Sequence, residues 1–216
     1  MILWFSGTGN SRYVAEMLAA ELGQTLRRLT PDLRNDSLTP APHDDTVIWV
    51  CPVYSWGLPP YVRSIISSVD LGSSPLTHHL VLTCGDDCGL TADMWRSDLA
   101  KRDWQSGLAF SVTMPNNYVC MSGFDVDPTE LAQSKLSAAS RRIREIARSI
   151  ADFRSGSEDC ANERDDVIRG RFAWIKTRII YPWFVRHAMS PKPFRYTREC
   201  ISCGKCAAIC PLRNIT

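Results

Sequence analysis

The chain opens with Met1-Ile2-Leu3-Trp4-Phe5-Ser6-Gly7-Thr8-Gly9-Asn10-Ser11, and this stretch decides the fold. Residues 1–5 are apolar, as in a buried strand, and residues 6–11 form a turn of small and hydroxyl-bearing residues. Val14, Leu18 and Leu22 then recur at helical spacing, which predicts a helix over residues 10–22.

Strands and helices continue to alternate up to residue 155. Asp127-Pro128-x-Glu130 is typical of a helix start, with Asp127 as the N-cap, and predicts a helix that runs through Phe153. The other helices are expected at residues 61–69 and 91–102, and the other strands at residues 25–29, 47–53, 79–84 and 108–114. Such regular alternation predicts an α/β fold in which a parallel sheet is covered by helices on both faces.

Composition indicates an ordinary globular protein with one sizeable domain and a small appendage, since its 216 residues are 44% hydrophobic and 22% charged. The amino terminus lacks the basic region of a signal peptide. The apolar stretch at residues 173–185 is interrupted by Lys176, Arg178 and Pro182, so no membrane-spanning helix is predicted. The nine cysteines, an odd number, favour free thiols and a cytoplasmic location.

The turn at Ser6–Ser11 has the composition of an anion-binding loop at a helix N-terminus. It has no Lys before its final Ser, which excludes a Walker A loop. Arg12 replaces the third glycine of a dinucleotide fingerprint, and Arg27 and Arg28 stand where an acidic ribose ligand is expected. A phosphate monoester bound without Mg²⁺ fits best, and a plain tight turn is the alternative.

Three further loops should emerge at the same edge of the sheet, because ligands of such folds bind beyond the carboxyl ends of the strands. These loops are residues 52–59, 84–89 and 114–118. Tyr54 and Trp56 would then bring aromatic faces to the anion-binding turn, which suits a planar heterocycle that carries a phosphate. Packing in the core or in a lid is the alternative for both. His78, His79 and His187 are expected to be surface or packing residues.

The carboxyl-terminal part carries Cys200-x2-Cys203-x2-Cys206-x3-Cys210-Pro211, the ligand spacing of a bacterial 4Fe-4S ferredoxin. Zinc sites more often use two separated cysteine pairs. In two-cluster ferredoxins the fourth cysteine ligates the other cluster, and no second run follows here. The missing ligand is expected from Cys160, from an exogenous group or from Cys210 itself.

Residues 164–198 form a basic and aromatic connector, with nine Lys and Arg against two Asp. Three roles are open: a tether that packs its aromatic residues on the acidic body, a membrane-surface helix, and a nucleic-acid-binding segment. The tether is favoured because Pro182, Pro191 and Pro193 are expected to break helices.

Phe5–Ser11, followed by Pro52-x-Tyr54-x-Trp56-Gly57, by Met114-Pro115-x-Asn117-Tyr118 and by the cysteine run, resembles the bacterial family that fuses a flavodoxin-like domain to a ferredoxin domain. The resemblance implies a doubly wound five-stranded parallel sheet of order 2-1-3-4-5 at residues 1–155, a linker and connector at 156–198, and a partial ferredoxin domain at 199–216. It implies FMN and 4Fe-4S clusters, and the second half of the ferredoxin domain is expected to be missing.

The resemblance also implies the site residues. The FMN phosphate is expected at residues 6–11, the ring between the loops after the third and fourth strands, and the partner of flavin N5 at the Trp56-Gly57 peptide, since glycine tolerates φ of either sign. Asp86 and Asp87 would disfavour an anionic reduced flavin, or simply form a solvated loop. The cofactor-binding residues are expected to be Ser6, Gly7, Thr8, Gly9, Asn10, Ser11, Tyr54, Ser55, Trp56, Gly57, Cys84, Gly85, Asp86, Asn117 and Tyr118, and the cluster ligands Cys200, Cys203, Cys206 and Cys210.

The function implied is electron transfer between FMN and iron–sulfur clusters, with a redox protein or a small electron acceptor as partner and with neither nucleic acid nor stable membrane insertion. The alternative from the enzyme class is an NAD(P)H-dependent FMN or quinone reductase that uses the same pocket. A third hypothesis is a folded scaffold without redox function.

Overall fold

The structure is a computed structural model and describes residues 1–34, 38, 40–41, 44–72, 74–156, 165–192 and 194–215. Most of the expected polar linker, and with it Cys160 as a cluster ligand, lies outside these residues.

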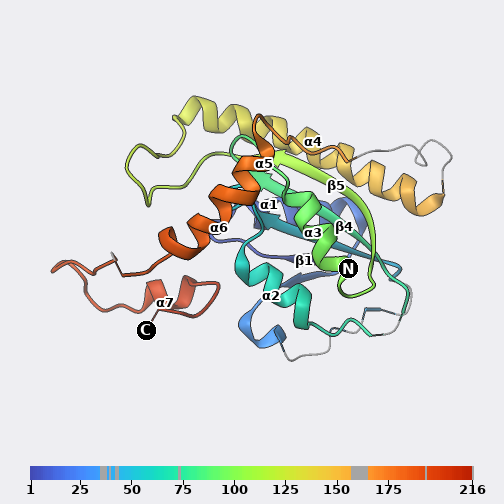
Figure 1. The fold of residues 1–216 in the computed structure, drawn as a ribbon, viewed down its shortest axis with the longest axis horizontal. Coiled ribbons are helices and arrows are strands. Elements are labelled where there is room, and N and C mark those ends of the chain that lie inside the picture. The colour runs from blue at the N-terminus through green and yellow to red at the C-terminus, as the bar shows by residue number, and fades with distance from the viewer. Residues whose placement is uncertain are drawn as a thin grey trace.

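The core of the molecule is a five-stranded sheet in which all neighbouring strands are parallel (Figure 1). The strands are β1 (Ile2–Trp4), β2 (Leu26–Arg28), β3 (Thr46–Pro52), β4 (Thr77–Cys84) and β5 (Gln105–Thr113). Their order is β2-β1-β3-β4-β5, so the chain moves first to one side of β1 and then to the other. This confirms the predicted sheet and places its switch point between β1 and β3.

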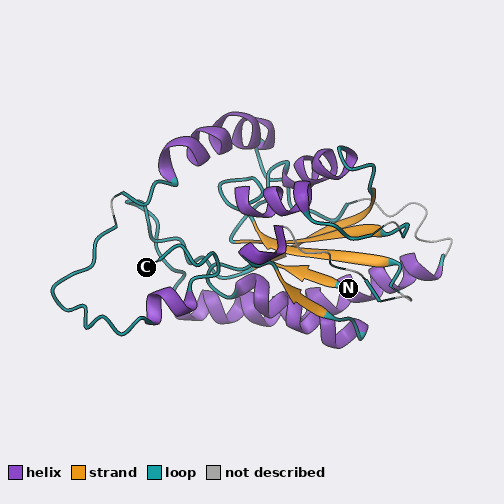
Figure 2. Ribbon diagram, turned by 90° about the horizontal axis from the view of Figure 1, so that it is seen from below, coloured by secondary structure: helices purple, strands orange, loops and turns teal. Residues whose placement is uncertain are grey.

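Helices cover both faces of the sheet (Figure 2). One face packs on α1 (Asn10–Leu22) and α4 (Thr129–Ser155), and the other on α2 (Pro60–Ser68) and α3 (Thr91–Ala100). Alternate residues of a strand enter opposite cores: Trp49 lies with α2 and α3, whereas Ile48 lies with α1 and α4. Because both faces of the sheet are covered, β1 and the central part of β3 are apolar at successive positions.

Local details differ from the prediction at the start of α4. Its N-cap is Pro128, and Asp127 does not cap it. The Asp127 carboxylate instead accepts a hydrogen bond from the backbone N–H of Asn116 at 2.9 Å and pairs with Lys135 at 2.7 Å. Asp127 thus ties the loop after β5 to α4.

Two neighbouring histidines of β4 are buried at the amino-terminal part of the sheet. Trp49 Nε1 donates to His78 Nδ1, and the backbone N–H of Leu108 donates to His79 Nδ1, both at 3.0 Å. Burial lowers the pKa of each imidazole from 6.5 to about 4. Both rings are therefore neutral at pH 7. Of the two expected roles, surface or packing residue, His78 and His79 have the packing role.

The connector is helical from Ala173 to Ala188, through Pro182. It comprises α5 (Ala173–Ile175), η3 (Lys176–Ile180), α6 (Tyr181–Trp183) and η4 (Phe184–Ala188), of which η3 and η4 are π-helical turns. The expectation that Pro182 breaks the helix is wrong. Pro182 lies at the start of α6, directly after the wide turn η3, and such a turn accommodates a residue that lacks the usual N–H.

The segments that precede and follow the helical part of the connector differ in their contact with the sheet. Asp166 pairs with β5 through two backbone hydrogen bonds, to Ala109 and from Ser111, so it extends the sheet edge. The carboxyl-terminal segment with α7 (Lys205–Ile209) lies beyond the sheet at the lower left of Figure 1. Within the described residues, none of the helices has the length and apolarity needed to cross a membrane.

Candidate cofactor site

Side-chain contacts bring three loops together at the carboxyl edge of the sheet. Asn117 Nδ2 donates to Thr8 Oγ1, and Asn10 Nδ2 donates to the carbonyl oxygen of Pro115 at 2.9 Å. The loop after β3 approaches the same turn, because a Cβ atom placed on Gly7 would lie only 2.8 Å from the Tyr54 hydroxyl. The structure thus places the loops after β1, β3 and β5 side by side.

The turn after β1 exposes backbone groups at the start of α1. Gly9 is the N-cap, with a φ of 114°, and no side chain caps the helix. Gly7, Thr8 and Gly9 are exposed, whereas Ser6 is buried and its Oγ accepts a hydrogen bond from Gly9 N at 2.9 Å. The first N–H groups of an α-helix have no partner within the helix and carry its positive end. This geometry suits an anion.

Ser11 has a structural use that the sequence did not reveal. Its side chain is buried, and its Oγ shares a hydrogen bond of 2.7 Å with Thr83 Oγ1 on β4. Any contribution of Ser11 to an anion site would therefore come from its backbone N–H.

The loop after β3 contains a tight turn at Tyr54–Gly57. The backbone N–H of each end residue donates to the carbonyl of the other, at 2.9 and 3.1 Å. The two central residues, Ser55 and Trp56, have φ of 47° and 62°. Left-handed backbone at two successive non-glycine residues is uncommon and costly, and such strain concentrates at functional sites.

The structure gives Gly57 a packing role that the sequence did not reveal, and the expected contact of its peptide with flavin N5 stays a prediction. The positive φ angles belong to Ser55 and Trp56, and the N–H of Gly57 is already bonded to Tyr54. Gly57 is required by packing, since a Cβ atom there would lie 2.3 Å from the ring of Tyr181 on the connector.

The connector joins the loops after β3 and β4. Thr177 is buried; its Oγ1 donates to the carbonyl oxygen of Trp56 and accepts from the backbone N–H of Leu90, both at 2.8 Å. The hydroxyl of Tyr181 donates to the carbonyl oxygen of Leu58. Sequence reasoning missed both residues, and the one available signal was a hydroxyl-bearing pair, four residues apart, inside an apolar helical run.

In the acidic loop after β4, Asp87 forms an ion pair with the connector. Asp87 pairs with Lys176 at 2.6 Å, and the Lys176 ammonium lies 4.9 Å from the centre of the Trp56 ring. Asp87 is therefore paired with a cation of the connector, and its effect on an anionic flavin stays a prediction. Asp86 is exposed.

Three other predicted residues of the site serve in packing or lie at its rim. Cys84 is buried, and its carbonyl oxygen accepts from Met114 N at 2.8 Å. Gly85 lies against the side chain of Asn116, where a Cβ atom could not fit. Tyr118 makes edge-on contacts with Phe124 and Phe184, with ring centres 5.5 and 6.2 Å apart.

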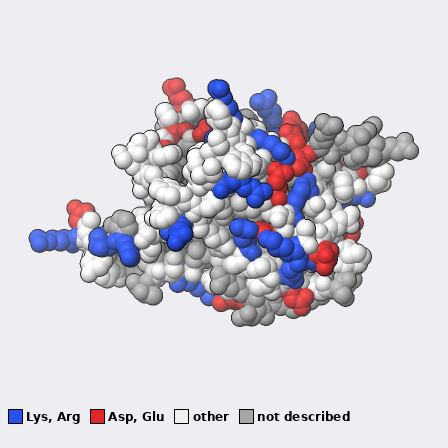
Figure 3. All heavy atoms as spheres, in the orientation of Figure 1, with Lys and Arg blue, Asp and Glu red and all other residues white. Residues whose placement is uncertain are grey.

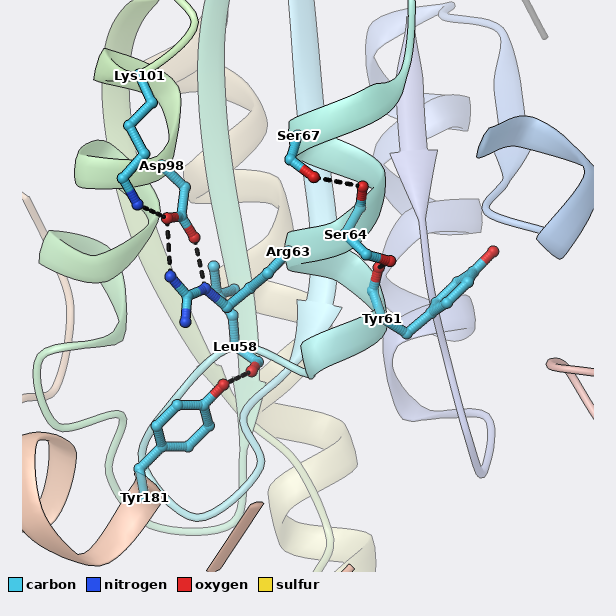
Figure 4. Close-up of polar contacts among 8 residues, drawn as sticks. All are labelled: Leu58, Tyr61, Arg63, Ser64, Ser67, Asp98, Lys101 and Tyr181. Atoms are coloured by element: carbon cyan, nitrogen blue, oxygen red, sulfur yellow. Dashed lines mark hydrogen bonds and ion pairs between the residues drawn. The ribbon is translucent and has the colours of Figure 1, made fainter. Parts of the chain in front are cut away.

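A cavity of about 420 Å³ lies elsewhere, between α2 and α3, and is not at the carboxyl edge. Arg63 donates two hydrogen bonds, of 2.6 and 2.8 Å, to the Asp98 carboxylate, which also binds Lys101 at 2.8 Å (Figure 4). Burial opposes ionisation of Asp98, but the bonds from both cations hold the pKa of this carboxyl below its usual value. Tyr181 reaches toward this network from the connector (Figure 4). The arrangement fastens α2, α3 and the connector together.

Comparison with known proteins gives likenesses of fold. No protein-family model matches the chain, and no curated protein matches it. The solved structures similar to it include a flavodoxin from Streptococcus pneumoniae (17% identity, 66% of this chain and 94% of that chain, TM-score 0.36). They also include an azoreductase from Bacillus anthracis (8%, 68% and 97%, 0.42) and an NAD(P)H:quinone oxidoreductase from Methanothermobacter marburgensis (14%, 67% and 94%, 0.35).

The strand order β2-β1-β3-β4-β5, with helices on both faces, decides the fold. The fold is flavodoxin-like. In a flavodoxin-like sheet the switch point lies between β1 and β3, and both the uncapped start of α1 and the strained turn at Tyr54–Gly57 lie at this point.

The predicted cluster ligands do not form a metal site in this structure. Cys200, Cys203 and Cys206 are exposed, and the Cys210 thiol donates to Asn214 Oδ1 at 2.8 Å. Among the described residues, no three His, Cys, Asp or Glu side chains are placed to hold one metal ion. The described residues as arranged here do not fit a 4Fe-4S cluster.

Proposed function

We propose that this flavodoxin-like chain binds FMN at the carboxyl edge of its sheet and exchanges electrons through it. One observation carries the proposal: an exposed, uncapped helix start lies beside a turn whose two central residues, Ser55 and Trp56, are held in left-handed conformations. The exposed helix start suits a phosphate. The strained turn suits a functional site, where an unfavourable backbone conformation is kept although it lowers the stability of the fold.

The residues present fit such a cofactor. Backbone N–H groups of residues 7, 8, 10 and 11 and the Thr8 hydroxyl would hold the phosphate, while the N–H of Gly9 is bonded to Ser6. Tyr54, Trp56 and Tyr118 are half-buried and would contact the ring. When bound, FMN supplies one- and two-electron redox chemistry, and the protein sets its potential by contacts and nearby charge.

The connector belongs to this site. Thr177 holds the carbonyl oxygen of Trp56 and the N–H of Leu90 in place, and Lys176 balances the charge of Asp87. We therefore take the cofactor-binding unit to include residues 165–189 in addition to residues 1–155. The electron partner in this proposal is a separate redox protein or a small acceptor.

Titration of the purified protein with FMN tests the proposal, with quenching of flavin fluorescence as the readout. Contact with aromatic rings is expected to quench the emission, and Trp56→Ala is expected to weaken binding about tenfold, which corresponds to about 1.4 kcal/mol. Trp174→Ala is the matched control, because Trp174 is exposed on the connector. Absence of saturable quenching in the wild type, or equal weakening by both variants, would refute the proposal. Steady oxidation of NADPH by the loaded protein would assign the reductase function instead of the carrier function.

A further inference from the structure

The outward side of the connector is an exposed apolar face. It consists of Phe172, Trp174, Ile175, Ile179 and Trp183, whose exposed fractions are 61, 61, 45, 55 and 53%. Isolated apolar residues on a surface are ordinary, but five large ones within residues 172–183 mark an interaction site. We call this set the connector face.

The inward side of the same segment fixes the connector face in its outward position. Thr177 and Tyr181 are 2 and 5% exposed and are bonded to the loop after β3. Lys176 adds the ion pair with Asp87. Because three anchors hold one side of the helical segment, the other side cannot turn inward to bury its apolar groups.

The connector face is surrounded by positive charge. Residues 167–198 contain eight Lys and Arg and no Asp or Glu. Arg171, Arg178 and Arg186 are exposed, and no ion pair of theirs occurs within the described part of the chain. Figure 1 places α5 and α6 between the middle of the view and the terminal segment at the left, and over this part of Figure 3 white and blue side chains predominate. The surface therefore combines bulky apolar groups with unneutralised cations.

We propose that the connector face binds the surface of membranes that contain anionic lipids, with the helical segment lying in the plane of the interface. Helices that adsorb in this way place Trp, Phe and aliphatic groups into the boundary of the acyl chains while Arg contacts the headgroups. Trp174 and Trp183 suit this boundary because the indole ring has an apolar body and a polar N–H.

The charge and the side chains argue against other occupants. A second copy of the chain would bring two strongly basic faces together without an acidic complement. Nucleic acid would pair with the arginines and stack on the tryptophans, but it offers no apolar volume to Ile175 and Ile179. An acyl-chain boundary accommodates both features at once.

The experiment is co-sedimentation of the purified protein, without added FMN, with vesicles of phosphatidylcholine alone or mixed with phosphatidylglycerol. Binding only to the mixed vesicles is expected, with loss at high salt and with a blue shift of tryptophan emission. Since each basic residue near an anionic surface contributes about 1 kcal/mol, the double variant Arg178→Ser/Arg186→Ser should weaken binding about thirtyfold.

Matched variants separate adsorption from a loss of folding. The double variant Trp174→Ser/Trp183→Ser should lose vesicle binding while it keeps the wild-type unfolding midpoint, because both side chains are exposed. Trp183→Phe should retain most of the binding, and Arg12→Ser, which removes an exposed arginine of α1, should change it little.

Three results overturn the inference. The first is wild-type protein that stays in the supernatant with both kinds of vesicle, and the second is binding that the paired Trp and Arg variants leave intact. The third is a dimer in sedimentation velocity that the Trp variants dissociate, which assigns the face to a second copy. Because the vesicle assay uses no flavin, its outcome is independent of the FMN titration.

Discussion

Thr177→Val tests whether the connector contributes to the candidate cofactor site. The substitution keeps the shape of the side chain and removes a hydroxyl that is 2% exposed. Two backbone groups lose their partner: the carbonyl oxygen of Trp56, 2.8 Å from Thr177 Oγ1, and the N–H of Leu90, also at 2.8 Å. Both lie in loops that would border the flavin ring.

The magnitude follows from these two bonds. A buried polar group left without a partner costs about 1–3 kcal/mol, and both bonds are only partly buried, so water replaces some of the loss. We expect the free energy of unfolding to fall by about 2–4 kcal/mol in total. Because the strained turn at Ser55 and Trp56 then loses a support, FMN affinity should fall about tenfold.

The assay is urea unfolding followed by circular dichroism, together with the FMN titration. Thr177→Ser is the matched control, since it retains the hydroxyl and should keep both bonds. The reasoning is refuted if the valine and serine variants unfold at the same urea concentration and bind FMN equally well. Loss of stability with unchanged FMN affinity would show that the connector braces the fold without shaping the cofactor site.

Three further predictions concern the packing around the site. His78 and His79 have pKa values of about 4 in the folded protein and about 6.5 in the unfolded chain. As the pH falls from 6.5 to 4, these two histidines therefore bind protons in the unfolded chain but not in the folded protein. Stability present above pH 6.5 should thus be lost by up to about 3 kcal/mol per ring. Urea unfolding against pH measures this loss, and His79→Asn, which keeps an acceptor for the Leu108 N–H, should flatten the profile. Asp98→Asn weakens a bidentate ion pair and should cost about 1–3 kcal/mol in thermal unfolding, whereas Lys101→Met, at an exposed partner, should cost under about 1 kcal/mol. Gly57→Ala should displace the connector, whose tyrosine ring occupies the place of the new methyl group. Trypsin should then cleave the connector faster, and an unchanged cleavage rate would contradict the packing argument.

Much of the fold followed from patterns within short windows. The apolar runs of β1, β3, β4 and β5, and the spacing of Val14 and Leu18 on α1, identify elements because a buried strand or a helix face imposes its own period on the sequence. The order of the strands came from resemblance to a family, and the structure confirms it. The boundaries were less accurate, as at Asp127, because a carboxylate near a helix start can bind other partners.

The candidate site also has features that the local sequence predicts and features that only contacts between distant residues explain. The small-residue turn at Ser6–Ser11 could be located from its composition alone, since the need for exposed N–H groups and for a glycine at φ 114° restricts the residues allowed there. The packing role of Gly57 could not be predicted from the sequence, because the ring that excludes a side chain at Gly57 follows it by 124 positions in the chain.

The sequence by itself therefore determined the alternation of strands and helices, the small-residue turn at Ser6–Ser11 and the basic, aromatic character of the connector. Only the tertiary structure decided that the connector crosses the loops after β3 and β4, that Lys176 neutralises Asp87, and which of the aromatic residues turn outward. The physical reason is the separation along the chain over which each kind of interaction acts. Periodicity and turn chemistry act between near neighbours in the chain, whereas the partner of a hydroxyl or a carboxylate is whichever group the folded chain brings within hydrogen-bonding distance.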